Sequence, residues 1–131
     1  MKTKKKLQLL ISYEEKAELK EKHLRKLIKF SKDKDSLVRS SAASLLINFE
    51  NKAAKKALLR LAGDKKAMVR CEAYDSLSVF QRKDVEKFLK KAVEEEENEL
   101  ALSYAIMSWA DVAAARGKNV EEKRSYATHL Q

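Results

Sequence analysis

The sequence predicts an all-α fold, a right-handed α-α superhelix (solenoid) of about three helical hairpins with a helical cap at each end. The first observation is an internal repeat: residues 33–49 (DKDSLVRSSAASLLINF) return 31 residues later as residues 64–80 (DKKAMVRCEAYDSLSVF). A fixed period with matched residue types indicates units that bury their apolar faces against their neighbours. The second observation is that the chain has no proline and only two glycines, so helices can continue between a few turns.

The third observation is helical spacing of the apolar residues in the second helix of each unit. Offsets of 0, 8 and 11 place side chains on one face of a helix with about 3.6 residues per turn. A third copy follows the second at an interval of 32, because an acidic connector adds one residue. The residues at these offsets are Val38, Leu46 and Phe49, then Val69, Leu77 and Phe80, and then Ala101, Trp109 and Val112.

These patterns predict one domain that covers the whole chain of 131 residues, which is long enough to bury a core without metals or disulfides. The predicted divisions are a basic arm and cap at 1–12, three units at 13–50, 51–82 and 83–116, and a terminal helix at 117–131.

The first unit is expected to begin with a long helix. Ser12 followed by Glu15 has the spacing of a capping box, so we expect a helix from near Tyr13 to about Phe30. Lys2 to Lys6 before it are expected to be frayed. The second helix of this unit is expected to run from near residue 36 to around residue 50.

The later units are marked by turns and by the two glycines. A helix at 53–62 is expected to end at Gly63, and Gly117 is expected to stop the last helix of the third unit. Because nothing follows the terminal helix to cover it, we expect that helix to dock on another copy or on a further unit. The remaining helices are expected at 67–81, 85–93, 100–115 and 120–130, with the acidic connector at 94–99.

The spacing Asp33-x5-Arg39 and Asp64-x5-Arg70, within the frame D-x4-V-R-x2-A, resembles HEAT repeats. The short unit is similar to HEAT-like repeats of the phycobilin-lyase type, and the resemblance covers residues 13–116. It implies that these Asp and Arg residues form a structural ladder that ties neighbouring units together.

The third unit departs from the HEAT pattern. Glu95 stands where the Asp is expected, and Leu102 occupies the Arg position. The repeats are also similar to those of HEAT-like alkylpurine DNA glycosylases, which use aromatic and acidic groove residues. Trp109, however, holds an apolar offset and is expected to face the core, so this enzyme class is disfavoured.

The net charge of +9 is unevenly distributed, since residues 1–90 hold 24 Lys and Arg against 12 Asp and Glu. Most of these lysines fall on or beside the first helices of the units, where we expect a solvated convex surface.

The second helices are expected to line the concave face. The predicted function is therefore a protein–protein interaction scaffold that binds a protein or peptide there. The alternative is a polyanion- or nucleic-acid-binding module that uses the basic arm and first helices.

The expected contact residues are those opposite the apolar face of the second helices, together with their flanks. Tyr104 and Met107 would supply apolar anchors, and Asp75 and Arg82 polar contacts. The full set is Ser40, Ser44, Cys71, Asp75, Arg82, Tyr104 and Met107.

No residue pattern indicates an enzyme, a cofactor or a metal site. Neither His23 nor His129 is placed to activate Cys71, and two histidines without further ligands make no metal centre. A single cysteine fits a reducing compartment, and the basic start precedes too short an apolar run for a signal peptide. With no membrane-spanning segment in the sequence, we expect a cytoplasmic protein.

Overall fold

The computed structural model describes residues 1–117, and these form seven α-helices and one short 3-10 helix without any strand. The terminal helix expected at 120–130, and association through it, lie outside the described residues. The elements are α1 (Thr3–Glu14), α2 (Glu21–Phe30), α3 (Ser36–Leu45), η1 (Leu46–Asn48), α4 (Lys52–Leu61), α5 (Ala67–Leu77), α6 (Lys83–Glu95) and α7 (Glu99–Ala115).

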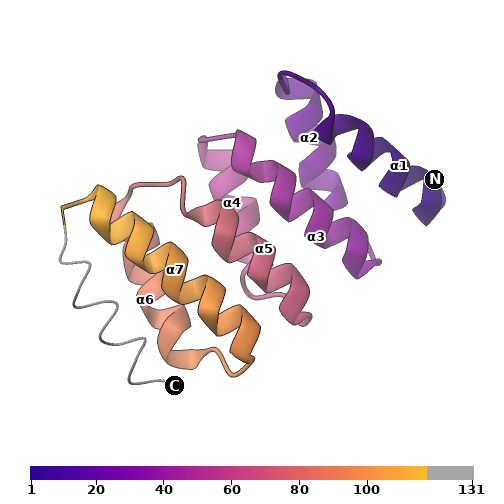
Figure 1. Cartoon of the computed structure of the whole chain (residues 1–131). Coiled ribbons are helices and arrows are strands. Elements are labelled where there is room, and N and C mark those ends of the chain that lie inside the picture. Colours follow the sequence, from indigo (N-terminus) through magenta and orange to yellow (C-terminus); the bar gives the residue numbers. More distant parts are fainter. Residues whose placement is uncertain (118–131) are drawn as a thin grey trace.

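The helices form two rows (Figure 1). Row A contains α2, α4 and α6, and row B contains α1, α3, α5 and α7, in which each helix packs against the next. The three hairpins are α2–α3, α4–α5 and α6–α7, stacked in chain order. The described chain is therefore an α-helical solenoid of three hairpins, preceded by one additional helix in row B.

The expectation of one helix from Tyr13 to Phe30 is wrong, because the chain leaves the helix at residues 15–20 and begins again at Glu21. Ser12 lies inside α1, where its hydroxyl donates to the Leu9 carbonyl at 2.6 Å, so it does not cap a following helix. Burial of Leu10 and Tyr13 explains the difference, since both pack into the core from α1.

The basic start of the chain is likewise helical from Thr3 onward instead of a frayed arm. Helix α1 packs against α3, and so takes the place that a second helix of a preceding unit would occupy. The solenoid therefore begins half a unit earlier than the sequence pattern indicated.

His23 fixes the start of α2. Its Nδ1 accepts a hydrogen bond from the Lys20 backbone N–H at 2.7 Å, and its ring meets the Tyr13 ring edge-on at 4.8 Å between centroids. Burial and the nearby charges of Lys16, Lys22 and Lys20 lower the pKa of His23, so the neutral ring that this hydrogen bond requires is favoured.

The repeated apolar offsets form the core as predicted. Val38, Val69 and Ala101 are fully buried, and Trp109 is 3% exposed at the position that Leu46 and Leu77 hold in the earlier units. This burial agrees with the expectation that Trp109 faces the core.

A serine also belongs to this core. Ser76 is 1% exposed, and its hydroxyl donates to the Ala43 carbonyl at 2.7 Å, which joins α5 to α3. Burial of a polar group is tolerated when it is hydrogen-bonded in this way.

Two helices end earlier than expected. Helix α3 ends at Leu45 and passes into η1, and α5 ends at Leu77. Asn48 Nδ2 donates to the Leu45 carbonyl at 2.9 Å, and the Ser78 hydroxyl donates to the Asp75 carbonyl at 2.6 Å. These side chains satisfy carbonyl groups that a longer helix would have paired.

Candidate interaction site

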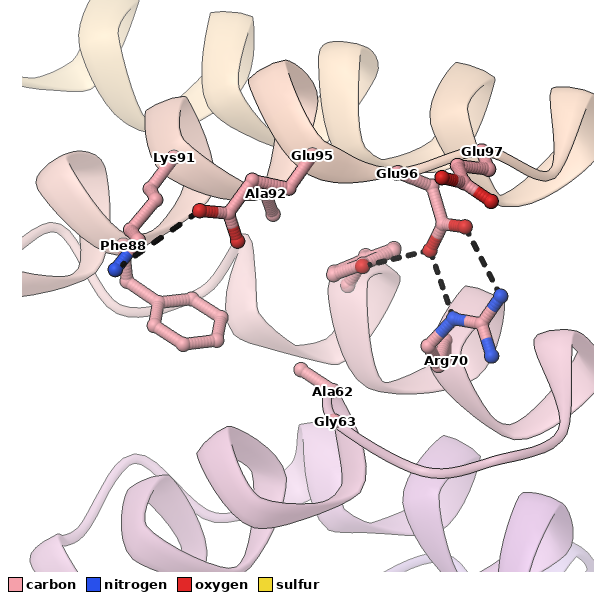
Figure 2. Close-up of a pocket in the computed structure, with 10 residues that line it drawn as sticks. Ala62, Gly63, Arg70, Phe88, Lys91, Ala92, Glu95, Glu96 and Glu97 are labelled. Carbon is pink, nitrogen blue, oxygen red and sulfur yellow. Dashed lines mark hydrogen bonds and ion pairs between the residues drawn. The ribbon is translucent and has the colours of Figure 1, made fainter.

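Three ion pairs join neighbouring units, and we call them the ladder. Each links a basic side chain of a row B helix to a carboxylate that precedes the next row B helix. In the two arginine pairs the guanidinium binds both carboxylate oxygens, a geometry stronger than that of neutral hydrogen bonds. The pairs are Lys6–Asp33, Arg39–Asp64 (2.8 and 3.1 Å) and Arg70–Glu96 (2.8 and 2.9 Å; Figure 2).

Each ladder carboxylate also holds its own connector. It accepts the backbone N–H two residues later, at 3.0 Å for Asp33, 2.9 Å for Asp64 and 3.0 Å for Glu96. Arg39 and Arg70 in turn donate to connector carbonyls at the start of their own helices. The ladder therefore fixes connectors and units together, the structural role that the HEAT resemblance implied.

In the third unit the ladder carboxylate is Glu96, so the assignment to Glu95 is wrong. The connector is one residue longer, and the interval of 32 places Glu96 opposite Asp64. Glu95 is exposed and lies 4.0 Å from Lys91 instead. Leu102 takes the Arg position of this unit, and the ladder of the described chain ends there.

Burial is the largest single influence on the pKa of Glu96, but the hydrogen bonds together outweigh it. Burial alone would raise its pKa, but bonds from Arg70, the Asn98 backbone N–H and the Tyr74 hydroxyl outweigh burial and lower the pKa to about 2. Burial, followed by the hydrogen bond to the charged Glu96, raises the pKa of Tyr74. Glu96 is thus held ionised as part of the structure.

The exposed surface of row B is apolar at one recurring position. Leu37, Met68 and Leu100 are 49%, 45% and 63% exposed, and each directly precedes the first inward residue of its helix. We define the row B face by this position and the two that follow it on the same side of each helix. Its members are Leu37, Ser41 and Ser44 on α3, Met68, Glu72 and Asp75 on α5, and Leu100, Tyr104 and Met107 on α7.

Two of the expected contact residues are not at this surface. Ser40 and Cys71 are 6% and 4% exposed, so the expectation that their side chains are open to a partner at the surface is wrong. Helices α3 and α5 each pack against a row B helix on both sides, which covers the flank that periodicity alone left open. Ser103, at the equivalent position of α7, is exposed, because among the described residues no row B helix follows α7.

Four expected residues do lie on the row B face: Ser44, Asp75, Tyr104 and Met107. Arg82 is exposed but lies in the turn between α5 and α6, directly before α6. The apolar row of Leu37, Met68 and Leu100 was not among the predictions. Its signal was present in the sequence as a large apolar residue repeated one position before each inward Val or Ala.

Lysine is present on the row A helices and on α1 but absent from α3, α5 and α7. Helices α2, α4 and α6 carry twelve Lys and Arg residues, whereas α3, α5 and α7 contain no lysine and only the two ladder arginines. The acidic residues Glu72, Asp75 and Asp111 lie on the solvent side of α5 and α7. The row B face is therefore apolar with a negative charge.

Glu72 is partly enclosed on this face. Burial, followed by the nearby charge of Asp75, raises the pKa of Glu72, while a hydrogen bond with Ser44 acts in the opposite direction. A positively charged group brought close to Glu72 would favour its ionised form, because the attraction offsets the cost of removing the carboxylate from water.

No group of His, Cys, Asp and Glu among residues 1–117 is arranged to hold a metal ion. Within the same residues, no helix combines the length and the apolar character that a bilayer crossing requires.

A family model described as HEAT repeats matches residues 24–110, which include most of α2, the helices from α3 to α6 and most of α7. No curated protein and no solved structure matched the chain.

Proposed function

Because the chain belongs to the HEAT-repeat family, we propose that it is a protein-interaction scaffold whose row B face binds a peptide or helix with apolar and basic side chains. Solenoid proteins commonly bind partners along the surface that their stacked repeats create. The observation that carries the proposal is the row of Leu37, Met68 and Leu100, exposed at equivalent positions of three adjacent helices.

The row is long enough for a specific contact. Packed helices lie about 8–10 Å apart, so three adjacent helices place the outer two of these side chains about 16–20 Å apart. That distance equals about three to four turns of a partner helix. Single exposed apolar residues are ordinary on protein surfaces, but their recurrence at equivalent positions of three adjacent helices supports an interaction site.

Met107 and Tyr104 extend this row along α7. Met107 is 65% exposed, and its unbranched side chain adapts to irregular partner surfaces. Tyr104 is half-buried against the core and contributes a rigid aromatic surface of the kind enriched at binding hot spots.

The charge of the row B face sets the chemistry of the partner. Glu72 and Asp75 would lose solvent on binding, and a buried carboxylate is costly unless it is paired. A partner with Lys or Arg beside its apolar residues removes this cost, whereas an acidic partner adds repulsion.

Selection from a random peptide display library against the purified chain tests the proposal. We expect enriched peptides to combine large apolar residues with Lys or Arg and to bind with a shallow salt dependence. Enrichment of acidic peptides, or of no apolar pattern, would contradict the assignment.

The second candidate function is polyanion binding by row A together with the basic start of α1, favoured by the twelve Lys and Arg residues on α2, α4 and α6. Binding to a nucleic acid oligonucleotide would then fall steeply with salt, because each neutralised phosphate releases counterions. Lys4 and Lys5 are exposed and can be replaced by Gln in this test, while Lys6 is kept because it pairs with Asp33.

A further inference from the structure

A cavity of about 500 Å³ lies between the C-terminal ends of α4 and α6 (Figure 2). It is separate from the row B face and shares no residue with it. Its walls include Ala62 after α4, Tyr74 on α5, and Phe88 and Ala92 on α6. The acidic residues Glu95 and Glu97 lie at its edge, beside the Arg70–Glu96 ion pair.

The equivalent place one unit earlier holds an arginine of the chain itself. Arg60 of α4 reaches back to Ser31, the residue that follows α2. Its Nη2 donates to the Ser31 hydroxyl at 2.6 Å, and its Nη1 donates to the Ser31 carbonyl at 3.3 Å. A guanidinium thus links the C-terminal ends of α2 and α4.

We call the contact between α2 and α4 the first interface and the contact between α4 and α6 the second. The second interface lacks both the arginine and the serine. The interval of 31 places Lys91 at the position of Arg60 and Ala62 at the position of Ser31. Lys91 has no guanidinium and lies 4.0 Å from Glu95, and Ala62 has no hydroxyl. The α4 and α6 helices are joined at their other ends, where Lys55 contacts Asp84 at 2.7 Å.

The walls of the open space also differ. Phe88 and Tyr74 stand where the first interface has Ala57 and Ala43. Aromatic rings attract planar cations through their faces, and guanidinium groups stack on them. The carbonyl end of α4 carries partial negative charge, and Glu95 and Glu97 add full charges nearby.

We propose that this cavity binds the guanidinium of an arginine side chain presented by a partner, in the position that Arg60 takes in the preceding interface. The Ala62 carbonyl accepts one N–H of the guanidinium, and the Phe88 ring lies against its plane. Glu95 pairs with the incoming guanidinium in place of Lys91. Arg70 remains with Glu96, since that pair belongs to the ladder.

Titration with N-acetyl-arginine amide, followed by ¹H–¹⁵N NMR, tests this site. We expect saturable shifts of the backbone amides of Gly63 and residues 95–97. The uncharged isostere N-acetyl-citrulline amide should bind at least about fivefold more weakly, because it lacks the charge that the rings and carboxylates attract. Equal shifts with both probes, or no saturable shift with arginine amide, would overturn the proposal.

A transplant variant gives the sharpest control. Ala62→Ser with Lys91→Arg places the Arg–Ser pair of the α2–α4 interface between α4 and α6, so the internal arginine should occupy the cavity and abolish binding of the probe. Saturable binding that persists in this variant, with the fold verified by circular dichroism, would overturn the proposal. If the variant does not fold, Glu95→Gln at an exposed position serves instead, and it must weaken binding of arginine amide without changing the binding of citrulline amide.

Discussion

Arg39 donates two hydrogen bonds to the carboxylate of Asp64, 25 residues later, and so joins the first unit to the second. The side chains of this pair are only 10% and 11% exposed. Arg70 repeats the contact with Glu96 one unit further on. The stack is therefore held together by shared ion pairs in addition to its apolar core.

Replacing Arg39 by Ala should lower the free energy of unfolding by about 1–3 kcal/mol, because hydrogen bonds to charged groups are lost and Asp64 stays partly buried. Arg25→Ala is the matched control, since Arg25 is 69% exposed and lies 4.0 Å from Glu21. Urea denaturation measures both variants. Equal midpoints for the two would show that the ladder does not stabilise the fold.

Stability in acid should depend on Glu96. Its pKa is about 2 in the folded chain, against an ordinary value of 4.5. A carboxyl group whose pKa is lower in the folded than in the unfolded chain stabilises the fold at pH values above its unfolded-state pKa. That contribution disappears as the pH falls from about 4.5 toward 2. The loss should be on the order of 2–3 kcal/mol, measured by urea denaturation at several pH values.

Glu96→Gln provides the comparison for this prediction. The variant should be less stable than the parent at pH 7 and should lose less stability between pH 4.5 and 2. Asp33 and Asp64 also have lowered pKa values, so part of the acid sensitivity should remain. Parallel pH profiles for parent and variant would rule out the assigned role of Glu96.

Cys71 should react slowly with thiol reagents while the chain is folded. It is 4% exposed, and its pKa is raised by burial and then by the charges of Glu72 and Glu96. Low thiolate content and poor access both reduce the rate. Reaction with Ellman's reagent should be fast in denaturant and at least about tenfold slower in buffer. Similar rates would place the thiol at the surface, as the sequence had suggested.

Ser76→Ala should destabilise the chain by about 1 kcal/mol, because the hydrogen bond from α5 to the Ala43 carbonyl is lost. Ser78→Ala, whose hydroxyl bonds only within its own turn, is the comparison. Thermal unfolding followed by the fluorescence of Trp109 reports both. A Ser76→Ala variant as stable as Ser78→Ala would show that this contact between helices contributes nothing.

The sequence predicted the repeated part of the fold because Val38, Val69 and Ala101 recur in register, and helical periodicity is a direct consequence of burial. It misplaced the break between α1 and α2, since the local Ser12–Glu15 pattern was outweighed by burial of Leu10 and Tyr13. Helix boundaries depend on such tertiary contacts, which a local capping pattern does not contain.

The candidate site was predicted less completely. Periodicity identifies the side of a helix opposite the core but not which flanks its neighbours cover, so Ser40 and Cys71 were wrongly placed at the surface. The cavity beside Phe88 depends on differences between units, such as Lys91 in place of Arg60. A repeat is recognised from residues that are alike in each unit, whereas this cavity arises where the units differ.

The row B face is tested most directly by the affinity of a peptide selected against the chain, measured by fluorescence anisotropy for two variants with the same change in net charge. Met68→Glu with Leu100→Glu alters the row B face, and Lys56→Gln with Lys87→Gln alters exposed positions of row A. We predict that the first variant weakens binding at least about thirtyfold, as loss of apolar anchors does, while the second changes it little. Binding that survives the first variant and disappears in the second would contradict the proposed site and assign the function to row A.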